Sequence, residues 1–176
     1  SSYLKTLKPD TEYYYEVFYD GKVQYRGIYR TLPSTEMSRN IVIAIGGDVG
    51  STAVARNITQ HLVALNPDVI IVGGDGAYDN GIRTCYYNQD LFLNMFEDLN
   101  KKLGRTVPLI FTIGNHELGI NSQSKGRPYG GDKDPLFFMF YPQHRGSKSL
   151  VPEISERETY FYHIIGKSIH LSLDSA

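Results

Sequence analysis

Three short apolar runs limit what this chain can fold into more than any other feature of its sequence. They are IVIAIG (41–46), VIIVG (69–73) and VPLIFTIG (107–114). Continuous apolar runs of this length are typical of strands that are covered on both faces, as in a parallel sheet. Each run ends at glycines and polar residues, so each predicted strand stops abruptly.

The two segments between these runs have the periodicity of amphipathic helices. Ser51 or Thr52 can cap the first helix and Asn66 can end it. Its predicted apolar face comprises Val54, Ile58, Leu62 and Leu65, and that of the second helix comprises Phe92, Met95, Phe96, Leu99 and Leu103, before Gly104. The order strand-helix-strand-helix-strand predicts an α/β fold with a parallel sheet and right-handed crossovers.

The flanking segments differ in composition from this central part. Residues 1–32 contain two Tyr- and Val-rich stretches around Asp20-Gly21, which predict a β-hairpin, and residues 33–40 have the character of a linker. The polar, Gly-rich segment 119–157 predicts a long surface excursion, and residues 159–175 predict a hairpin that turns at Gly166-Lys167. Two strands alone are marginally stable, so the first hairpin needs partners.

Composition excludes several classes of protein. Of the 176 residues, 41% are hydrophobic and the net charge is −1, which indicates a globular domain and gives no basic excess for nucleic acid or an anionic membrane. No apolar run approaches the roughly 20 residues of a membrane span. The single cysteine, Cys85, excludes an internal disulfide. Asn57-Ile58-Thr59 is a glycosylation sequon at Asn57, a triplet that also arises by chance.

Polar side chains follow each of the three predicted strands. Asp48 follows the first, Asp75 and Tyr78 follow the second, and Asn115 and His116 follow the third. Because the carboxyl ends of parallel strands meet at one edge of a sheet, we expect these groups to converge there. Hard oxygen ligands suit divalent and trivalent metals, and two ions about 3.5–4 Å apart are a common arrangement. One carboxylate can bridge two ions, and Asp75 is the natural candidate.

Two further acidic residues beside this set have open roles. Asp79 could be a turn residue, or it could orient a metal ligand without binding the metal itself. Glu117 could orient His116 or cap the segment that follows it, and the sequence favours neither role.

The order of these motifs resembles the metallophosphoesterase superfamily and, within it, the purple acid phosphatases of plant type. Their Asp, Gly-Asp-x-x-Tyr and Gly-Asn-His-Glu motifs match at Asp48, at Asp75 with Tyr78, and at residues 115–117. The resemblance implies that residues 41–176 form the first half of a catalytic β-sandwich flanked by helices. It also implies that residues 1–32 are the last hairpin of a fibronectin III-like domain.

The same resemblance implies an acid phosphatase that hydrolyses phosphate monoesters at a binuclear metal centre. Asp48 and Tyr78 would bind iron(III), Asp75 would bridge both ions, and Asn115 would bind a divalent ion (iron, zinc or manganese). Asn115 and His116 would contact the substrate phosphate, and His116 would assist proton transfer as the catalytic residue. By the same analogy the protein would be secreted, vacuolar or lysosomal.

One departure from the family pattern bears on activity. The later Val-x-x-His and Gly-His-x-His motifs, which supply imidazole ligands, are absent from this sequence. The other histidines (His61, His144, His163 and His170) lack that context, and we expect them to be structural or solvent-facing. The rest of the polypeptide or a partner chain would then supply the imidazoles, and this chain alone would be inactive. A homodimer is a separate expectation from the same resemblance. The alternative is a non-catalytic binding or structural protein with an incomplete metal centre.

Overall fold

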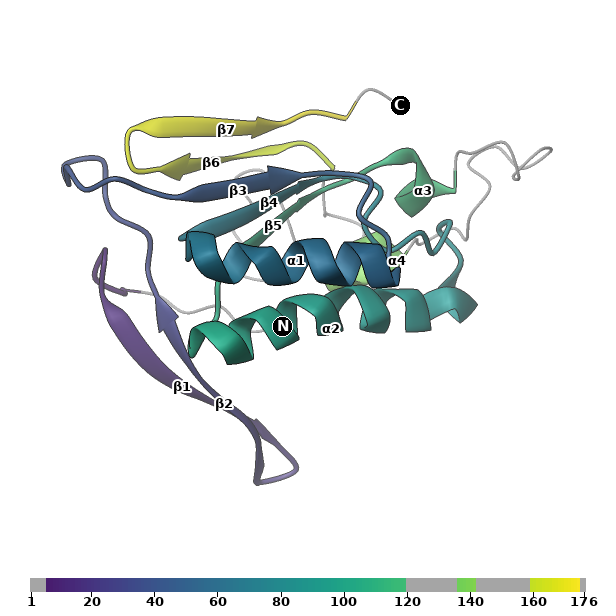
Figure 1. Cartoon of the computed structure of the whole chain (residues 1–176), viewed down its shortest axis with the longest axis horizontal. Coiled ribbons are helices and arrows are strands. Elements are labelled where there is room, and N and C mark those ends of the chain that lie inside the picture. The colour runs from purple at the N-terminus through teal and green to yellow at the C-terminus, as the bar shows by residue number, and fades with distance from the viewer. Residues whose placement is uncertain (1–5, 120–135, 142–158, 175–176) are drawn as a thin grey trace.

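A parallel three-stranded sheet forms the centre of the computed structural model, which describes residues 6–119, 136–141 and 159–174 (Figure 1). Its strands are β3 (Ile43–Gly46), β4 (Val69–Gly73) and β5 (Leu109–Thr112), in the order β3-β4-β5. Helices α1 (Ala53–Leu65) and α2 (Tyr86–Leu103) connect them and cover one face of the sheet. The predicted α/β architecture is therefore confirmed.

Local signals in the sequence account for the ends of both helices. The Thr52 side chain accepts a hydrogen bond of 3.1 Å from the Ala55 amide and caps the start of α1. Asn66 ends α1 in the left-handed conformation, and Gly104 ends α2 in the same way. The short 3-10 turn η1 (Arg83–Cys85) leads directly into α2.

Of the predicted apolar face of the first helix, Leu62 packs against the core, and the other three residues do not. Val54, Ile58 and Leu65 are 68%, 63% and 57% exposed, whereas Ala55 and Thr59 are buried. The buried face is therefore turned by about one residue, because α1 packs its small side chains against α2 and the sheet. A groove of about 210 Å³ remains between β3 and α1, lined by apolar side chains that include Ile45 and Ile58.

The expectation that all three strands are buried on both faces holds for β4 and fails for β3. Val69, Ile70 and Val72 of β4 are at most 4% exposed, whereas Ile45 of β3 is 71% exposed. The strand β3 lies at one edge of the described sheet, so only one side of it is paired.

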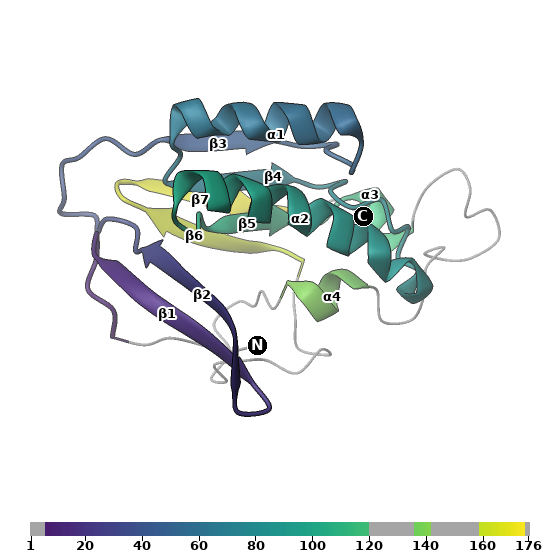
Figure 2. The ribbon, with the colours of Figure 1, turned by 60° about the horizontal axis from the view of Figure 1, so that its bottom comes forward.

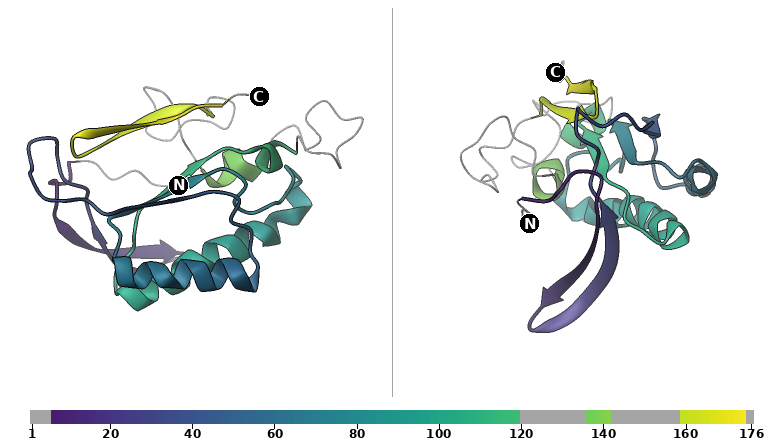
Figure 3. Two further views of the ribbon diagram at one scale, coloured as in Figure 1. Left: turned by 45° about the horizontal axis from the view of Figure 1, so that its top comes forward. Right: turned by 90° about the vertical axis from the view of Figure 1, so that its left-hand side faces the viewer.

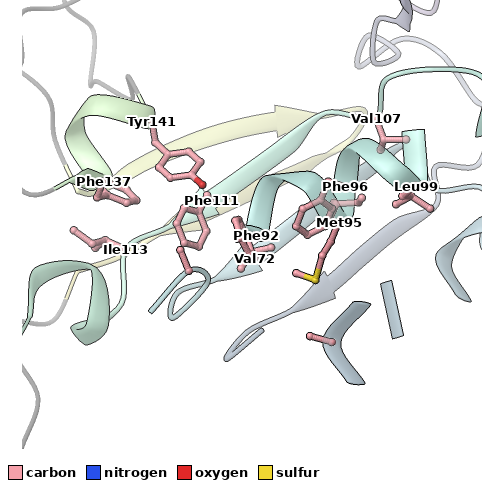
Figure 4. Packing of buried hydrophobic residues seen from close by; sticks show 13 residues of the cluster. Val72, Phe92, Met95, Phe96, Leu99, Val107, Phe111, Ile113, Phe137 and Tyr141 are labelled. Atoms are coloured by element: carbon pink, nitrogen blue, oxygen red, sulfur yellow. The ribbon is translucent and has the colours of Figure 1, made fainter. Parts of the chain in front are cut away.

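The core is centred on the aromatic ring of Phe111 in β5 (Figure 4). The Phe92 ring of α2 lies 5.5 Å from it, and the Phe137 and Tyr141 rings lie at 5.7 and 4.5 Å. Phe137 belongs to α4 (Leu136–Phe140), so this short helix is held to β5 by aromatic packing. Such fully buried rings each contribute several kcal/mol to stability.

The N-terminal hairpin projects from the body of the molecule (Figure 2). It consists of β1 (Glu12–Tyr19) and β2 (Lys22–Arg30), antiparallel, with a bulge at Val17/Phe18. Its attachment lies at Thr106, whose amide donates to the Ile28 carbonyl at 2.6 Å and whose hydroxyl lies 2.6 Å from the Tyr15 hydroxyl.

A second hairpin, β6 (Phe161–Ile165) and β7 (Ser168–Ser172), lies on the side of the sheet opposite the helices (Figure 3). It turns at Gly166-Lys167, as predicted. Phe161 and Ile165 are buried toward the sheet, and Ile164, Ile169 and Leu171 are exposed on the outer side. Most of the excursion 119–157, with His144, lies outside the described residues.

Arginine and aspartate side chains hold the edge of the sheet at the amino ends of the strands, here called the amino edge. Arg39 donates to Asp10 at 2.7 Å and, with two nitrogens, to both Asp68 oxygens at 2.9 and 3.0 Å. The Val42 amide also donates to Asp68. Burial alone would raise the pKa of Asp68, but the Arg39 and Val42 donors lower it below its ordinary value.

In the described residues, no helix is long and apolar enough to cross a bilayer.

Candidate metal centre

The loops that follow β3 and β4 lie side by side at the carboxyl ends of the strands, here called the carboxyl rim. The Asp48 amide donates to the Gly74 carbonyl at 3.2 Å, and the Val49 amide donates to the Asp75 carbonyl at 3.0 Å. The two loops therefore continue the pairing of their strands, which brings the first two predicted ligands to the same edge.

The loops after β4 and β5 approach each other just as closely. A Cβ atom at Gly74, whose φ is +84°, would lie only 2.9 Å from the Gly114 Cα atom. Glycine at position 74 thus permits both the left-handed backbone and the close contact between the loops.

Four non-glycine residues of the rim have left-handed backbones. Asp48 and Asp75 have φ of 51°, Tyr78 has 56° and Asn80 has 57°. This conformation is uncommon outside glycine, tolerable for Asp and Asn, and a marked outlier for tyrosine. Strained backbones of this kind cluster at functional sites, because the surrounding structure must hold them in place.

Tyr78 connects the first loop to the third. Its hydroxyl donates to Asp48 Oδ1 at 3.2 Å, and its ring lies 4.4 Å from the His116 ring. Burial and the neighbouring Asp48 carboxylate raise the pKa of Tyr78 to about 12, so the phenol is protonated at neutral pH in the absence of a cation.

The third loop supplies Asn115 and His116 from a single helical turn, α3 (Asn115–Leu118). The His116 amide donates to Asp75 Oδ1 at 3.0 Å, which fixes the Asp75 carboxylate. His116 Nδ1 lies 2.6 Å from Asn80 Oδ1. Asn115, the first residue of α3, is exposed at the rim.

Glu117 connects the second and third loops from below. Its side chain is fully buried and accepts hydrogen bonds of 2.8–3.0 Å from the Asp75, Gly76 and Gly114 amides. Because the Gly114 amide precedes α3, Glu117 caps the start of the helix that contains it, and not the segment that follows it as predicted, and it also holds the Asp75 loop. Burial raises the pKa of Glu117 to about 7, although the three amides lower it.

Asp79 anchors the second loop to α2. It accepts from the Gly81 amide at 2.8 Å and from Gln89 Nε2 at 2.6 Å, and Gln89 accepts from the Tyr141 hydroxyl. Burial raises the pKa of Asp79, although Gln89 and Gly81 lower it. Asp79 is thus both a turn residue and a support behind Tyr78.

The other residues singled out in the sequence lie on other elements. Asn57 is exposed on α1, while the Thr59 hydroxyl of its sequon is buried and donates to the Ala55 carbonyl. His61 is exposed on the same helix. His163 and His170 are opposite each other in the second hairpin, where burial and His170 lower the pKa of His163.

The sequence analysis missed the partners of two rim residues. Asn80 contacts His116 across 36 positions, and Gln89 contacts Asp79 across ten. The Asn80-Gly81 pair signals only a turn, and Gln89 lies on a face of α2 otherwise buried by apolar residues. For Gln89, the available signal was a polar residue at a position of α2 that faces the core.

The charge pattern of the rim favours a cation. Within the described part of the chain, neither Asp48 nor Asp75 forms an ion pair, and their hydrogen-bond donors are a phenol and a backbone amide. No three His, Cys, Asp or Glu side chains gather closely enough among the described residues to hold a metal ion. The candidate set instead combines two carboxylates with the Tyr78 phenol and the Asn115 amide. These are hard oxygen donors, which suit di- and trivalent cations.

The sequence is similar to those of known proteins. The model of the family "calcineurin-like phosphoesterase" matches residues 41–169, well over half of the chain. Purple acid phosphatase 15 of Arabidopsis thaliana is 29% identical over 68% of this chain and 26% of its own length. The probable purple acid phosphatase 20 of the same plant is 31% identical over 64% of this chain and 24% of its own length. The chain therefore spans about a quarter of the length of these relatives.

Proposed function

Because this chain belongs to the calcineurin-like phosphoesterase family, we propose that the protein is an acid phosphatase that hydrolyses phosphate monoesters at a binuclear metal centre. The similarity to two plant purple acid phosphatases supports this reaction class. The observation that carries the proposal is the convergence of Asp48, Asp75, Tyr78 and Asn115 on the carboxyl rim. Among the described residues, these two carboxylates accept side-chain and amide hydrogen bonds only from neutral donors, which leaves their charge available to a cation.

In this proposal Asp48 and Tyr78 would hold iron(III), Asn115 would hold a divalent ion, namely iron, zinc or manganese, and Asp75 would serve as a ligand of both. When bound, such ions polarise the phosphoryl oxygens and lower the pKa of bound water so that hydroxide is available. The remaining ligands are imidazoles from the rest of the polypeptide or from a partner chain, and this chain alone would be inactive.

The residues of this chain then orient the reacting groups. Glu117 holds the Asp75 loop against the Gly114 loop through three backbone amides, which fixes the spacing of the donors. Asn115 and His116 lie at the start of α3, where they contact the substrate phosphate, and His116 moves a proton to or from the reacting oxygen. Positioning of this kind contributes to rate because it removes the entropy cost of alignment.

Three further features belong to the same proposal. Residues 1–32 are the end of a fibronectin III-like domain, residues 33–40 are a linker, and residues 41–176 are the first half of the catalytic domain. The protein is secreted, vacuolar or lysosomal, and Asn57, exposed on α1, carries a glycan.

The decisive experiment compares Asp75→Asn with Asp68→Asn in the intact protein. Asn suits the left-handed backbone at position 75, so the exchange removes charge without new strain. We expect turnover of a phosphate monoester to fall about a thousandfold or more and metal content to fall with it. Asp68→Asn, at the amino edge, should leave both nearly unchanged. Near-normal turnover in Asp75→Asn would refute the role of Asp75.

A second candidate function is a non-catalytic binding protein with an incomplete metal centre. The exposed aromatic hairpin favours it, because Tyr14, Phe18 and Tyr19 are 64%, 60% and 77% exposed. Stoichiometric metal binding by the intact protein without hydrolysis of any phosphate ester would support this function over the first.

A further inference from the structure

Two neighbouring side chains of α2 bind the loop that carries Tyr78. Asn88 Nδ2 donates a hydrogen bond of 3.0 Å to the Tyr78 carbonyl, and Gln89 Nε2 donates one of 2.6 Å to the Asp79 carboxylate. Gln89 and Asp79 are fully buried and Asn88 is half-buried, so water competes little for these bonds. Consecutive residues of one helix therefore hold consecutive residues of the loop.

These bonds act where the backbone conformation is least favourable. Tyr78 has φ of 56°, and a side chain of this size rarely adopts the left-handed region. Such a conformation persists only where the surrounding structure fixes it. The same backbone decides where the phenol lies, with its hydroxyl 3.2 Å from Asp48 Oδ1 and its ring 4.4 Å from the His116 ring.

The orientation of the Gln89 amide is fixed at its other end as well. Its Oε1 atom accepts a hydrogen bond of 3.1 Å from the Tyr141 hydroxyl, and the Tyr141 ring packs 4.5 Å from Phe111 in the core. A half-turn of the amide would exchange its donor and its acceptor, which would break both bonds. Tyr141 therefore keeps the NH₂ group of Gln89 directed at Asp79.

We infer that Asn88 and Gln89 are positioning residues for Tyr78, which hold its phenol where it can serve as a metal ligand. The ligand role of Tyr78 rests on the proposed function, whereas the position of its ring is a property of this chain alone. Removal of a partner that orients a metal ligand typically weakens metal binding about 10- to 100-fold.

The test variants are Asn88→Ala and Gln89→Met, made in the intact protein. Methionine keeps the length of the glutamine side chain without its amide, so the core stays filled. Asn100→Ala is the matched control for Asn88→Ala, because Asn100 is also half-buried on α2 and also bonds the backbone. Its Oδ1 atom accepts from the Val107 amide at 3.0 Å, toward the opposite end of the helix from the rim.

The first readout is the nuclear Overhauser effect between the Tyr78 and His116 rings in the metal-free protein. We expect it in the native protein and in Asn100→Ala, and we expect it to be weak or lost in Asn88→Ala and Gln89→Met. The second readout is the affinity for iron(III), measured by equilibrium dialysis against nitrilotriacetate. It should fall about 10- to 100-fold in both test variants and stay unchanged in the control.

A double-mutant cycle separates this role from general support of the loop. In a Tyr78→Phe background, Asn88→Ala and Gln89→Met should no longer change the affinity for iron, because the two residues act through the phenol. An equal loss of affinity with and without the phenol, or a ring contact that survives in both test variants, would overturn the inference.

Failure of the proposed function gives a different result. A native protein that shows the ring contact, and loses it in the test variants, but neither binds iron nor hydrolyses a phosphate ester would count against the proposed function. The positioning of the Tyr78 ring by α2 would stand in that case.

Discussion

Carboxylates lie at both ends of the parallel strands, but their hydrogen-bond partners differ in charge. At the amino edge, Arg39 neutralises Asp10 and Asp68 through charge-assisted hydrogen bonds of 2.7–3.0 Å. At the carboxyl rim, Asp48 and Asp75 are held by a phenol and a backbone amide, and buried Glu117 by three backbone amides. Within the described residues, the carboxylates of the amino edge are paired with a cationic side chain, whereas those of the carboxyl rim are not.

Because of this difference, we interpret the amino edge as a structural cluster and the carboxyl rim as a candidate cation site. A carboxylate paired with an arginine has little affinity left for a cation, whereas carboxylates held by neutral donors keep their charge available. The left-handed backbones do not follow the same division strictly: four such non-glycine residues lie in the rim loops (Asp48, Asp75, Tyr78 and Asn80), and Asp10 of the amino edge is another.

Glu117→Ala should lower the free energy of unfolding by about 3–5 kcal/mol, because three buried backbone amides lose their acceptor. Urea unfolding followed by circular dichroism measures the change. The control is Glu97→Ala, which removes a surface pair with Lys101 and should cost at most about 0.5 kcal/mol. Equal losses in the two variants would show that Glu117 does not hold the rim.

Addition of a transition-metal cation should stabilise the intact protein through the rim. At a free concentration of about 100 times the dissociation constant, the expected gain is about 2.7 kcal/mol. Differential scanning calorimetry with and without metal measures it. The gain should disappear in Asp75→Asn and persist in Asp68→Asn; the reverse pattern would place the cation at the amino edge.

Asp68→Asn should lower the free energy of unfolding at neutral pH by about 1–2 kcal/mol, because Arg39 loses a charged partner. The pKa of Asp68 is below its ordinary value of 3.8, so its contribution is complete above that value and is lost as the pH falls through the lowered pKa. Native protein and variant should therefore converge in acid. A difference that stays constant down to acid pH would contradict the role of this ion pair.

Tyr15→Phe should have the smallest effect, a loss of about 0.5–1.5 kcal/mol, because it removes the hydroxyl bonded to Thr106. Hydrogen exchange at the Thr106 amide, which bonds the Ile28 carbonyl, reports local loosening of the hairpin. Tyr14→Phe is the matched control, since its hydroxyl donates a hydrogen bond to the exposed Glu16. Faster exchange in the control variant would mean that Tyr15 is not the attachment point.

The sequence was informative wherever one local signal decides the outcome. Apolar runs followed by glycine predicted the three parallel strands, and Thr52, Asn66 and Gly104 marked the helix ends. The convergence of Asp48, Asp75 and His116 follows from the parallel order of the strands alone.

The sequence was uninformative where the outcome depends on long-range packing. The buried face of α1 is decided by how the helix packs against α2 and the sheet, so Val54 and Ile58 were misplaced. The role of Glu117 stayed open because its three amide donors come from two loops, one of them some 40 positions earlier. Asn80 and His116 are 36 positions apart, so the periodicity of a helix or a strand does not predict their contact.

The left-handed backbones at positions 48 and 75 have a consequence for how this protein can change through mutation. Asparagine adopts that conformation as easily as aspartate, so replacing either aspartate by asparagine should leave the loop backbone almost unchanged. A single nucleotide change in an aspartate codon would therefore remove a proposed metal ligand and leave the fold intact. At either position, one substitution can therefore give a protein that keeps the fold and loses part of the proposed metal site.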